Sequence, residues 1–233
     1  MRLLALRRRP AHIPLAPTGR HALTPPLAFA RPLMDAAEWD RRYADSDRPP
    51  RREPVPVVAE LVAPLEPGRA LDLAAGTGRN AVWLARSGWR VTAVDFSRVG
   101  LAKARERADA AGVEMEYVVA DVHDYDPAPL TFDLVLIAYL HPEPGARAQL
   151  FADVTRWVAP GGRLLVVGLD ASDPKAATGT MDPDRRFTPD RLEGAFPGIE
   201  LTRCERVTRE RETPDGVERS VDTVAWGLRR YDG

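Results

Sequence analysis

The chain of 233 residues contains few of the residues that build disulfides and metal centres. It has one cysteine, Cys204, which excludes an internal disulfide and a cysteine-cluster metal site. The four histidines show no metal-ligand spacing, so we expect no metal. No apolar run approaches the roughly 20 residues of a membrane helix. We therefore expect a cytoplasmic protein without a membrane partner.

Excess charge of either sign is also missing. The formal net charge is −1, which provides no electrostatic footprint for nucleic acid, and we expect no nucleic-acid partner. Apolar residues make up 44% of the chain and charged residues 29%, which is typical of a globular protein. The length allows one large α/β domain with a buried core.

Acidic residues are absent from the first 34 positions, which hold six arginines and six prolines. The prolines prevent long helices or strands, and the segment has no serine, unlike a transit peptide. This composition cannot bury a core. We expect residues 1–34 to be a disordered tail, or upstream sequence ahead of a true start at Met34.

The most informative stretch is residues 70–80, which read as a strand, a turn of small residues and a helix. Ala70–Leu73 is apolar except for Asp72, and Ala81, Leu84 and Ala85 recur at helical spacing. Small residues in the turn let a ligand approach the backbone, while the free N–H groups of the new helix point at that ligand.

Two ligand classes use such a turn. Residues 76–81 satisfy the dinucleotide pattern G-x-G-x-x-G/A, so an NAD(P)-linked oxidoreductase stays open as an alternative. However, Asp72 at the strand end would repel a pyrophosphate. The same carboxylate would attract the ammonium and sulfonium groups of S-adenosylmethionine (SAM).

Residues 72–78, Asp-Leu-Ala-Ala-Gly-Thr-Gly, resemble the first motif of class I SAM-dependent methyltransferases, D/E-x-G-x-G-x-G, with alanine at the first glycine position. The resemblance extends over residues 70–228 and is nearest to the small-molecule branch, which includes tellurite-resistance and thiopurine methyltransferases. It implies a Rossmann-like, doubly wound α/β fold with seven strands, mostly parallel, and an antiparallel C-terminal strand. It also implies SAM as cofactor. The implied cofactor-binding residues are Asp72, Ala74, Gly76, Gly78, Asp95, Phe96, Asp121, Val122 and Ala138.

Specific roles are predicted for two of these acids, Asp95 and Asp121. Asp95 ends the β-branched strand 90–94, where it can accept hydrogen bonds from both ribose hydroxyls, with Phe96 covering an adenine face. A helix N-terminal charge is the alternative for Asp95. Asp121 follows the strand 116–119 at the position that meets the adenine amino group in the methyltransferase pattern, although it can equally cap the next turn.

The acceptor is expected after the most apolar strand, residues 132–137, because ligands of open α/β sheets bind at the carboxyl ends of strands. Tyr139 and His141 are our candidate catalytic residues, and His141 can serve as a general base near neutral pH. Capping of the following helix is the alternative for His141. The motif N/D-P-P-Y, carried by many enzymes that methylate nucleobase or amide nitrogens, is absent.

A short helix is expected over residues 35–44, with Trp39 and Tyr43 on one face. This aromatic pair either packs on the core or forms a lid over the cofactor, as in similar methyltransferases. We divide the chain into residues 1–34, a helical lid over 35–66, and the SAM-binding domain over 67–233.

After a fifth strand at 163–169, strands at 200–208 and 220–230 are expected to pair through a turn at Thr213-Pro214-Asp215-Gly216. The sequence favours a SAM-dependent methyltransferase that acts on a small-molecule acceptor by in-line displacement, as a monomer or homodimer. The other alternative is a non-catalytic module that binds SAM or a partner protein.

Overall fold

The structure is a computed structural model that describes residues 35–45, 52–174, 181–213 and 216–231. The basic segment 1–34 lies outside these residues, and so do Pro214 and Asp215 of the expected turn. None of the helices in the described part of the chain combines the length and the apolar character needed to span a bilayer.

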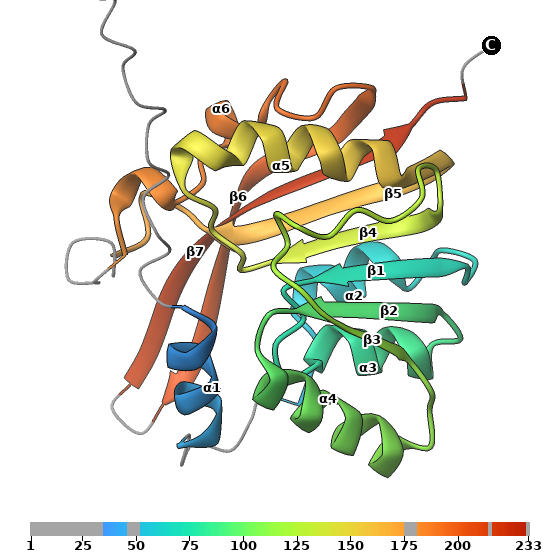
Figure 1. Ribbon diagram of the computed structural model, residues 1–233. Coiled ribbons are helices and arrows are strands. Elements are labelled where there is room, and N and C mark those ends of the chain that lie inside the picture. The colour runs from blue at the N-terminus through green and yellow to red at the C-terminus, as the bar shows by residue number, and fades with distance from the viewer. Residues whose placement is uncertain (1–34, 46–51, 175–180, 214–215, 232–233) are drawn as a thin grey trace, which may run out of the picture.

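Seven strands form one sheet in the order β3-β2-β1-β4-β5-β7-β6 (Figure 1). Their bounds are β1 (Arg69–Leu73), β2 (Arg90–Asp95), β3 (Glu116–Val119), β4 (Phe132–Ala138), β5 (Val158–Leu169), β6 (Ile199–Thr213) and β7 (Gly216–Arg229). The first five strands pair in parallel, and β7 runs antiparallel to both β5 and β6. The predicted mostly parallel α/β sheet with an antiparallel C-terminal strand is confirmed.

Helices cover both faces of the sheet. They are α1 (Ala36–Ala44), α2 (Pro56–Val62), α3 (Arg79–Arg86), α4 (Arg98–Ala111), α5 (Pro144–Trp157), the short 3₁₀ helix η2 (Pro183–Arg185) and α6 (Pro189–Leu192). The helices α5 and α6 pack on one face, and α2, α3 and α4 pack on the other (Figure 1). Each face has its own apolar cluster, which explains why the central strands β1 and β4 are apolar in consecutive residues rather than in alternate ones.

Residues 35–66 do not behave as one lid. Val57, Val58 and Val62 of α2 are buried in the core together with Trp89, so α2 belongs to the body of the domain. In the described part of this segment, α1 is the helix that reaches the turn after β1, where its Tyr43 lies against Gly76. It begins with a capping box in which Asp35 and Glu38 bond each other's backbone amides, so this short helix is stabilised locally.

The C-terminal hairpin is longer than expected. Whereas the sequence predicts strands at 200–208 and 220–230, β6 and β7 pair from Ile199↔Arg229 to Thr213↔Gly216, with one register shift between Leu201 and Arg203. The last residue of β5, Leu169, pairs with Asp222, so the hairpin continues past the sheet at its carboxyl edge. The fifth strand also begins earlier than the expected residue 163, because α5 ends at Trp157 and β5 begins at once with Val158.

Gly78, the last residue of the turn, has a packing role. A β-carbon on Gly78 would lie 2.6 Å from the β-carbon of Ala104 in α4, and the backbone of Gly78 is left-handed, with φ +78°. Glycine therefore lets the start of α3 pack closely against α4.

We predict that Gly78→Ala lowers the free energy of unfolding by about 2–5 kcal/mol, the sum of a left-handed alanine and an overpacked contact. Gly112→Ala is the matched control, because Gly112 is also left-handed (φ +68°) and nothing lies within 4 Å of its added β-carbon. Urea unfolding of both variants measures the difference. Equal losses in the two would show that the Ala104 contact is not limiting.

Candidate functional site

The turn after β1 is built from alternating left-handed residues. Ala74, Gly76 and Gly78 have φ angles of +56°, +56° and +78°. The amide of Ala75 donates to the carbonyl of Val94 at 3.0 Å, which ties the turn to the end of β2. Alanine therefore adopts the conformation of the motif's first glycine at a cost of roughly 1–2 kcal/mol.

Asp72 is a buried carboxylate beneath this turn. It is 1% exposed, and its Oδ2 atom has no hydrogen-bond partner among the described residues. Burial raises the pKa of Asp72 to about 7, whereas the charge of Arg79 and the amide of Ala81 oppose that rise. An unpartnered buried oxygen of this kind suits a cationic ligand, which would stabilise the ionised form.

Asp95 at the end of β2 connects two turns. Its Oδ2 accepts the amide of Gly76 and its Oδ1 accepts the amide of Ser97, each at 2.8 Å. The side chain is 3% exposed, and burial raises the pKa of Asp95. A carboxylate has about four lone-pair positions, so each oxygen can still accept one ligand hydroxyl.

The aromatic pair of α1 lies at this turn. The rings of Trp39 and Tyr43 are 5.2 Å apart between centroids. The hydroxyl of Tyr43 is 2.7 Å from where a β-carbon on Gly76 would be, and the Tyr43 ring is 3.0 Å from the corresponding position at Gly100. Tyr43 therefore lies over the two glycines whose missing side chains leave the backbone bare.

Tyr139 follows β4 in a left-handed conformation with φ +62°, which is uncommon for a bulky residue and marks strain. Its hydroxyl donates to Oδ2 of the buried Asp222 in β7 at 2.7 Å. Asp222 is also paired with Arg209 through two hydrogen bonds. The guanidinium groups of Arg79 and Arg209 lie 5.2 and 5.6 Å from the centroid of the Tyr139 ring. The end of β4 and the C-terminal hairpin thus meet at one aromatic residue.

The surroundings of His141 disfavour its predicted role as a general base. The ring is 5% exposed, its Nε2 accepts the amide of Leu169 at 2.9 Å, and it packs against Phe187. Burial lowers the pKa of His141 to about 4. An enclosed imidazole whose lone pair is already bonded cannot accept a substrate proton. The capping alternative does not hold either, because α5 is preceded by Glu143, which makes no side-chain cap. His141 instead joins the loop after β4 to the end of β5.

The four other predicted cofactor residues lie at or shortly after the carboxyl ends of β2, β3 and β4. Asp121 accepts the amide of His123 at 2.9 Å, so it does cap the next turn, and adenine contact stays a prediction. Val122 is a core residue, 8% exposed. Phe96 directly follows β2, and Ala138 is the last residue of β4. Both are half-buried, and their contacts with a cofactor stay predictions.

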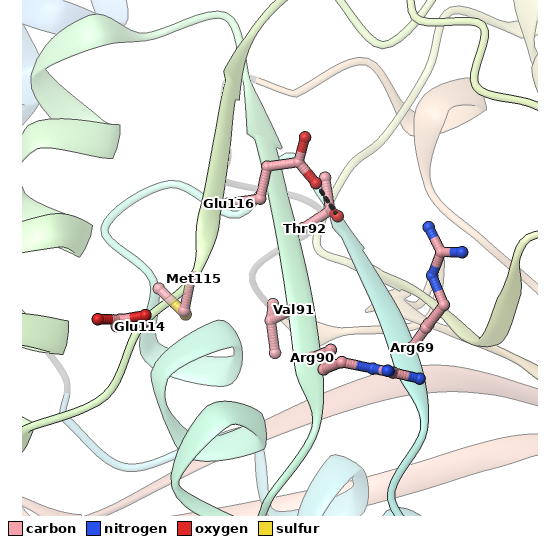
Figure 2. A pocket seen from close by; sticks show the side chains of 7 residues that line it. All are labelled: Arg69, Arg90, Val91, Thr92, Glu114, Met115 and Glu116. Atoms are coloured by element: carbon pink, nitrogen blue, oxygen red, sulfur yellow. Dashed lines mark hydrogen bonds between the residues drawn. The ribbon is translucent and has the colours of Figure 1, made fainter.

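The opposite edge of the sheet has an open cavity of about 570 Å³. Figure 2 shows its lining side chains, with Arg69 and Arg90 on neighbouring strands and Glu116 bonded to the hydroxyl of Thr92. It lies at the amino ends of β1, β2 and β3, where an open α/β sheet does not bind its ligand. We therefore assign the candidate site to the carboxyl ends, where Tyr43 covers the turn.

Residues 70–162 match the family model described as a methyltransferase domain. Over this segment the chain is similar to the methyltransferase class that its turn motif resembles. SAM is the methyl donor of that class, and the observed residues fit it: a bare left-handed turn, an unpartnered acid in Asp72, and a second acid in Asp95 with lone pairs to spare. The dinucleotide alternative gains no support from the family match.

Curated relatives match about half of this chain. A demethylmenaquinone methyltransferase of Thermus thermophilus is 35% identical over 124 residues, which cover 52% of this chain and 56% of that protein. The ubiquinone/menaquinone biosynthesis C-methyltransferase UbiE of Desulfotalea psychrophila is 38% identical over 109 residues, which cover 46% and 43%. The chain therefore spans about half the length of the curated relatives it matches.

Solved structures show the same fold over more of this chain. One solved structure has a TM-score of 0.70 at 21% identity and covers 85% of this chain and 93% of its own. It is described as the conversion of a disulfide bond into a thioacetal group during echinomycin biosynthesis. TehB from Haemophilus influenzae has a TM-score of 0.66 at 14% identity, covering 83% and 68%. At these identities the likeness establishes the fold alone.

Sequence reasoning missed four residues at the candidate site. Asp222 and Arg209 lie far from the turn in sequence, although an acid inside the apolar strand 221–226 was a usable signal. Asp40 bonds the start of α4 but looks like an ordinary surface acid of a polar helix. Arg79 is part of the motif region, yet only the structure places it against Tyr139.

We predict that Asp95→Ala weakens binding of S-adenosylhomocysteine (SAH) by about 1.5–3 kcal/mol or more, because hydrogen bonds from ribose hydroxyls to a charged acceptor are lost. Calorimetric titration measures the affinity, and urea unfolding measures the accompanying loss of the Gly76 and Ser97 contacts. Asp133→Ala is the control, because Asp133 also accepts a backbone amide, that of Arg69, but at the opposite edge. Unchanged SAH affinity in Asp95→Ala would contradict the ribose assignment.

The lowered pKa of His141 predicts a pH dependence of stability. The unfolded chain binds a proton at this residue below about pH 6.5, whereas the folded chain does so only near pH 4. The stabilisation is therefore complete above about 6.5 and falls by about 3 kcal/mol between 6.5 and 4. Asp72 acts with the opposite sign, because its folded pKa is raised, so folding binds its proton more tightly and its contribution is lost as pH rises toward 7.

His141→Gln separates the two effects, since glutamine keeps an acceptor for the Leu169 amide but does not titrate. Urea unfolding at pH 4.5, 5.5 and 7 is expected to show that the free energy of unfolding of the wild type, relative to that of the variant, falls as the pH is lowered, because only the wild type loses the His141 contribution while both keep that of Asp72. Parallel curves would show that His141 titrates normally in the folded protein.

Proposed function

We propose that this protein transfers a methyl group from SAM to a small-molecule acceptor bound between the end of β4 and the C-terminal hairpin. The observation that carries the proposal is the arrangement around Tyr139, whose strained backbone, aromatic ring and bonded hydroxyl lie between Arg79 and the Asp222–Arg209 pair. These side chains come from α3, β6, β7 and the segment after β4, and together they form an acceptor wall with aromatic and guanidinium surfaces.

Relatives narrow the proposed acceptor. Two curated relatives are named as a demethylmenaquinone methyltransferase and a menaquinone or ubiquinone biosynthesis C-methyltransferase, and both act on quinone precursors by those names. An aromatic acceptor also suits the aromatic and guanidinium surfaces around Tyr139, which favour π-systems. A hydroxylated aromatic ring, methylated at carbon or oxygen, is therefore our first acceptor class.

The proposed mechanism depends mainly on position. SAM, when bound, supplies a methyl group that its sulfonium already activates for in-line displacement. Asp72 would balance the positive charge of the cofactor, and Asp95 would hold its ribose. Tyr139, fixed by Asp222, would hold the acceptor in line with the methyl carbon. Alignment of this kind can supply roughly 7–11 kcal/mol of a barrier. His141 contributes indirectly by fixing the loop that carries Tyr139.

Calorimetric titration with SAM, SAH and NAD tests the cofactor, and transfer of radiolabelled methyl to a demethylmenaquinol analogue tests the acceptor. We expect micromolar binding of SAM and SAH, no binding of NAD, and labelled product. Binding of NAD alone would contradict the cofactor. Tight SAH binding without transfer to any hydroxylated aromatic acceptor would contradict the acceptor class and favour the non-catalytic alternative.

Tyr139→Phe tests the acceptor wall while keeping the ring. Loss of the hydrogen bond to Asp222 costs about 1 kcal/mol, so kcat/KM for the acceptor is expected to fall about 5–10-fold. SAH affinity should stay within about twofold, because the hydroxyl contacts Asp222 and not the glycine turn. An equal loss in SAH affinity would place Tyr139 in the cofactor site instead.

A further inference from the structure

The helix α1 is attached to the α/β body by one carboxylate. Oδ1 of Asp40 accepts the hydroxyl of Ser97 and also the amide of Val99, at 3.1 Å. These groups belong to the first turn of α4, whose N-terminal amides have no partner within the helix. An acid from α1 therefore caps α4 from outside, with favourable charge at the helix N-terminus.

Ser97 connects this attachment to the predicted ribose acid. It is completely buried, and its amide donates to Oδ1 of Asp95 while its hydroxyl donates to Asp40 and accepts the amide of Gly100 at 2.9 Å. One residue thus contacts the carboxylate under the turn and the carboxylate of α1. A change at either carboxylate reaches the other through a single side chain.

Two further contacts define where the attached helix lies. The ammonium group of Lys103 in α4 donates to the carbonyl of Tyr43. The Tyr43 ring fills the space that a side chain on Gly76 or Gly100 would occupy. Tyr43 follows Asp40 by three residues in α1. Because Asp40 is fixed on α4, the Tyr43 ring is held over the glycine turn.

We propose that Asp40 and Ser97 are positioning residues that hold Tyr43 over the glycine turn, so that release of a bound adenosyl cofactor requires the Asp40–Ser97 contact to open. This rests on the proposed function, because it assumes that the cofactor binds at the turn between Asp72 and Asp95. Asp40 and Ser97 act through Tyr43 and Asp95 and do not belong to the acceptor wall. In this arrangement α1 governs how long the cofactor stays bound.

The main test uses Asp40→Ala, with SAH as the probe and stopped-flow fluorescence as the measurement. The SAH dissociation rate is expected to rise about tenfold while the association rate changes less than about threefold, because the contact retains the ligand. Asp40→Asn keeps an oxygen acceptor and should restore a rate within about threefold of the wild type. Arg41→Ala is the control on the same helix, since Arg41 is exposed and neighbours Asp40 in the sequence.

Two more variants test the same contact independently. Gly100→Ala leaves every hydrogen bond of Asp40 in place but pushes against the Tyr43 ring, so it should accelerate SAH release as well. In the double variant Asp40→Ala/Ser97→Ala, the rate should not exceed that of Asp40→Ala by more than about twofold, because the Asp40–Ser97 contact is already lost in the single variant. Additive effects would show that the two residues act separately.

A readout without ligand completes the experiment. Amide hydrogen exchange of residues 36–44 in the unliganded protein should be faster in Asp40→Ala than in the wild type or Arg41→Ala, because α1 is released. If the wild type fails to bind SAH, the proposed function fails. If the wild type binds SAH and Asp40→Ala releases it at the same rate, or binds it more tightly, the positioning role is overturned, since tighter binding would mean that Tyr43 blocks the turn.

Discussion

The carboxylate of Asp95 is the contact on which the candidate site depends. Its two oxygens hold the amides of Gly76 and Ser97, so the turn after β1 and the turn after β2 have a fixed relation. Charged acceptors make stronger hydrogen bonds to backbone amides than neutral ones, and this acid is almost completely buried. The left-handed turn is therefore held open by a side chain from the neighbouring strand as well as by its own small residues.

The site holds two buried carboxylates whose ionised forms are disfavoured by burial. Burial raises the pKa of both Asp72 and Asp95, so each ionised carboxylate is costly without a partner. Arg79 partly offsets this cost for Asp72, and backbone amides do so for Asp95. Acids kept at such a cost at the carboxyl edge of a parallel sheet are typical of binding sites, and here they agree with the methyltransferase family match.

The sequence predicted what depends on short-range pattern. The turn at 74–78, the acid ending β2 and the apolar strand β4 follow from residue size, periodicity and position, and the structure has them where expected. Prediction from the sequence failed where long-range packing decides the surroundings of a residue. His141 looks like an accessible base after β4, but the amide of Leu169, 28 residues later, occupies its free nitrogen. Likewise, nothing local distinguishes Asp40 from the other acids of α1, because its partners lie almost 60 residues away.

Ala74 shows that the shared feature of this turn is a set of backbone angles more than a set of glycines. Positions 74, 76 and 78 all have positive φ, and only two of them are glycine. Asparagine and aspartate also tolerate this region, whereas β-branched residues do not. A motif search that counts glycines therefore scores this chain as imperfect, while a comparison of dihedral angles recognises it fully. Diverged relatives with asparagine or alanine at the same position would be found by the second criterion and lost by the first.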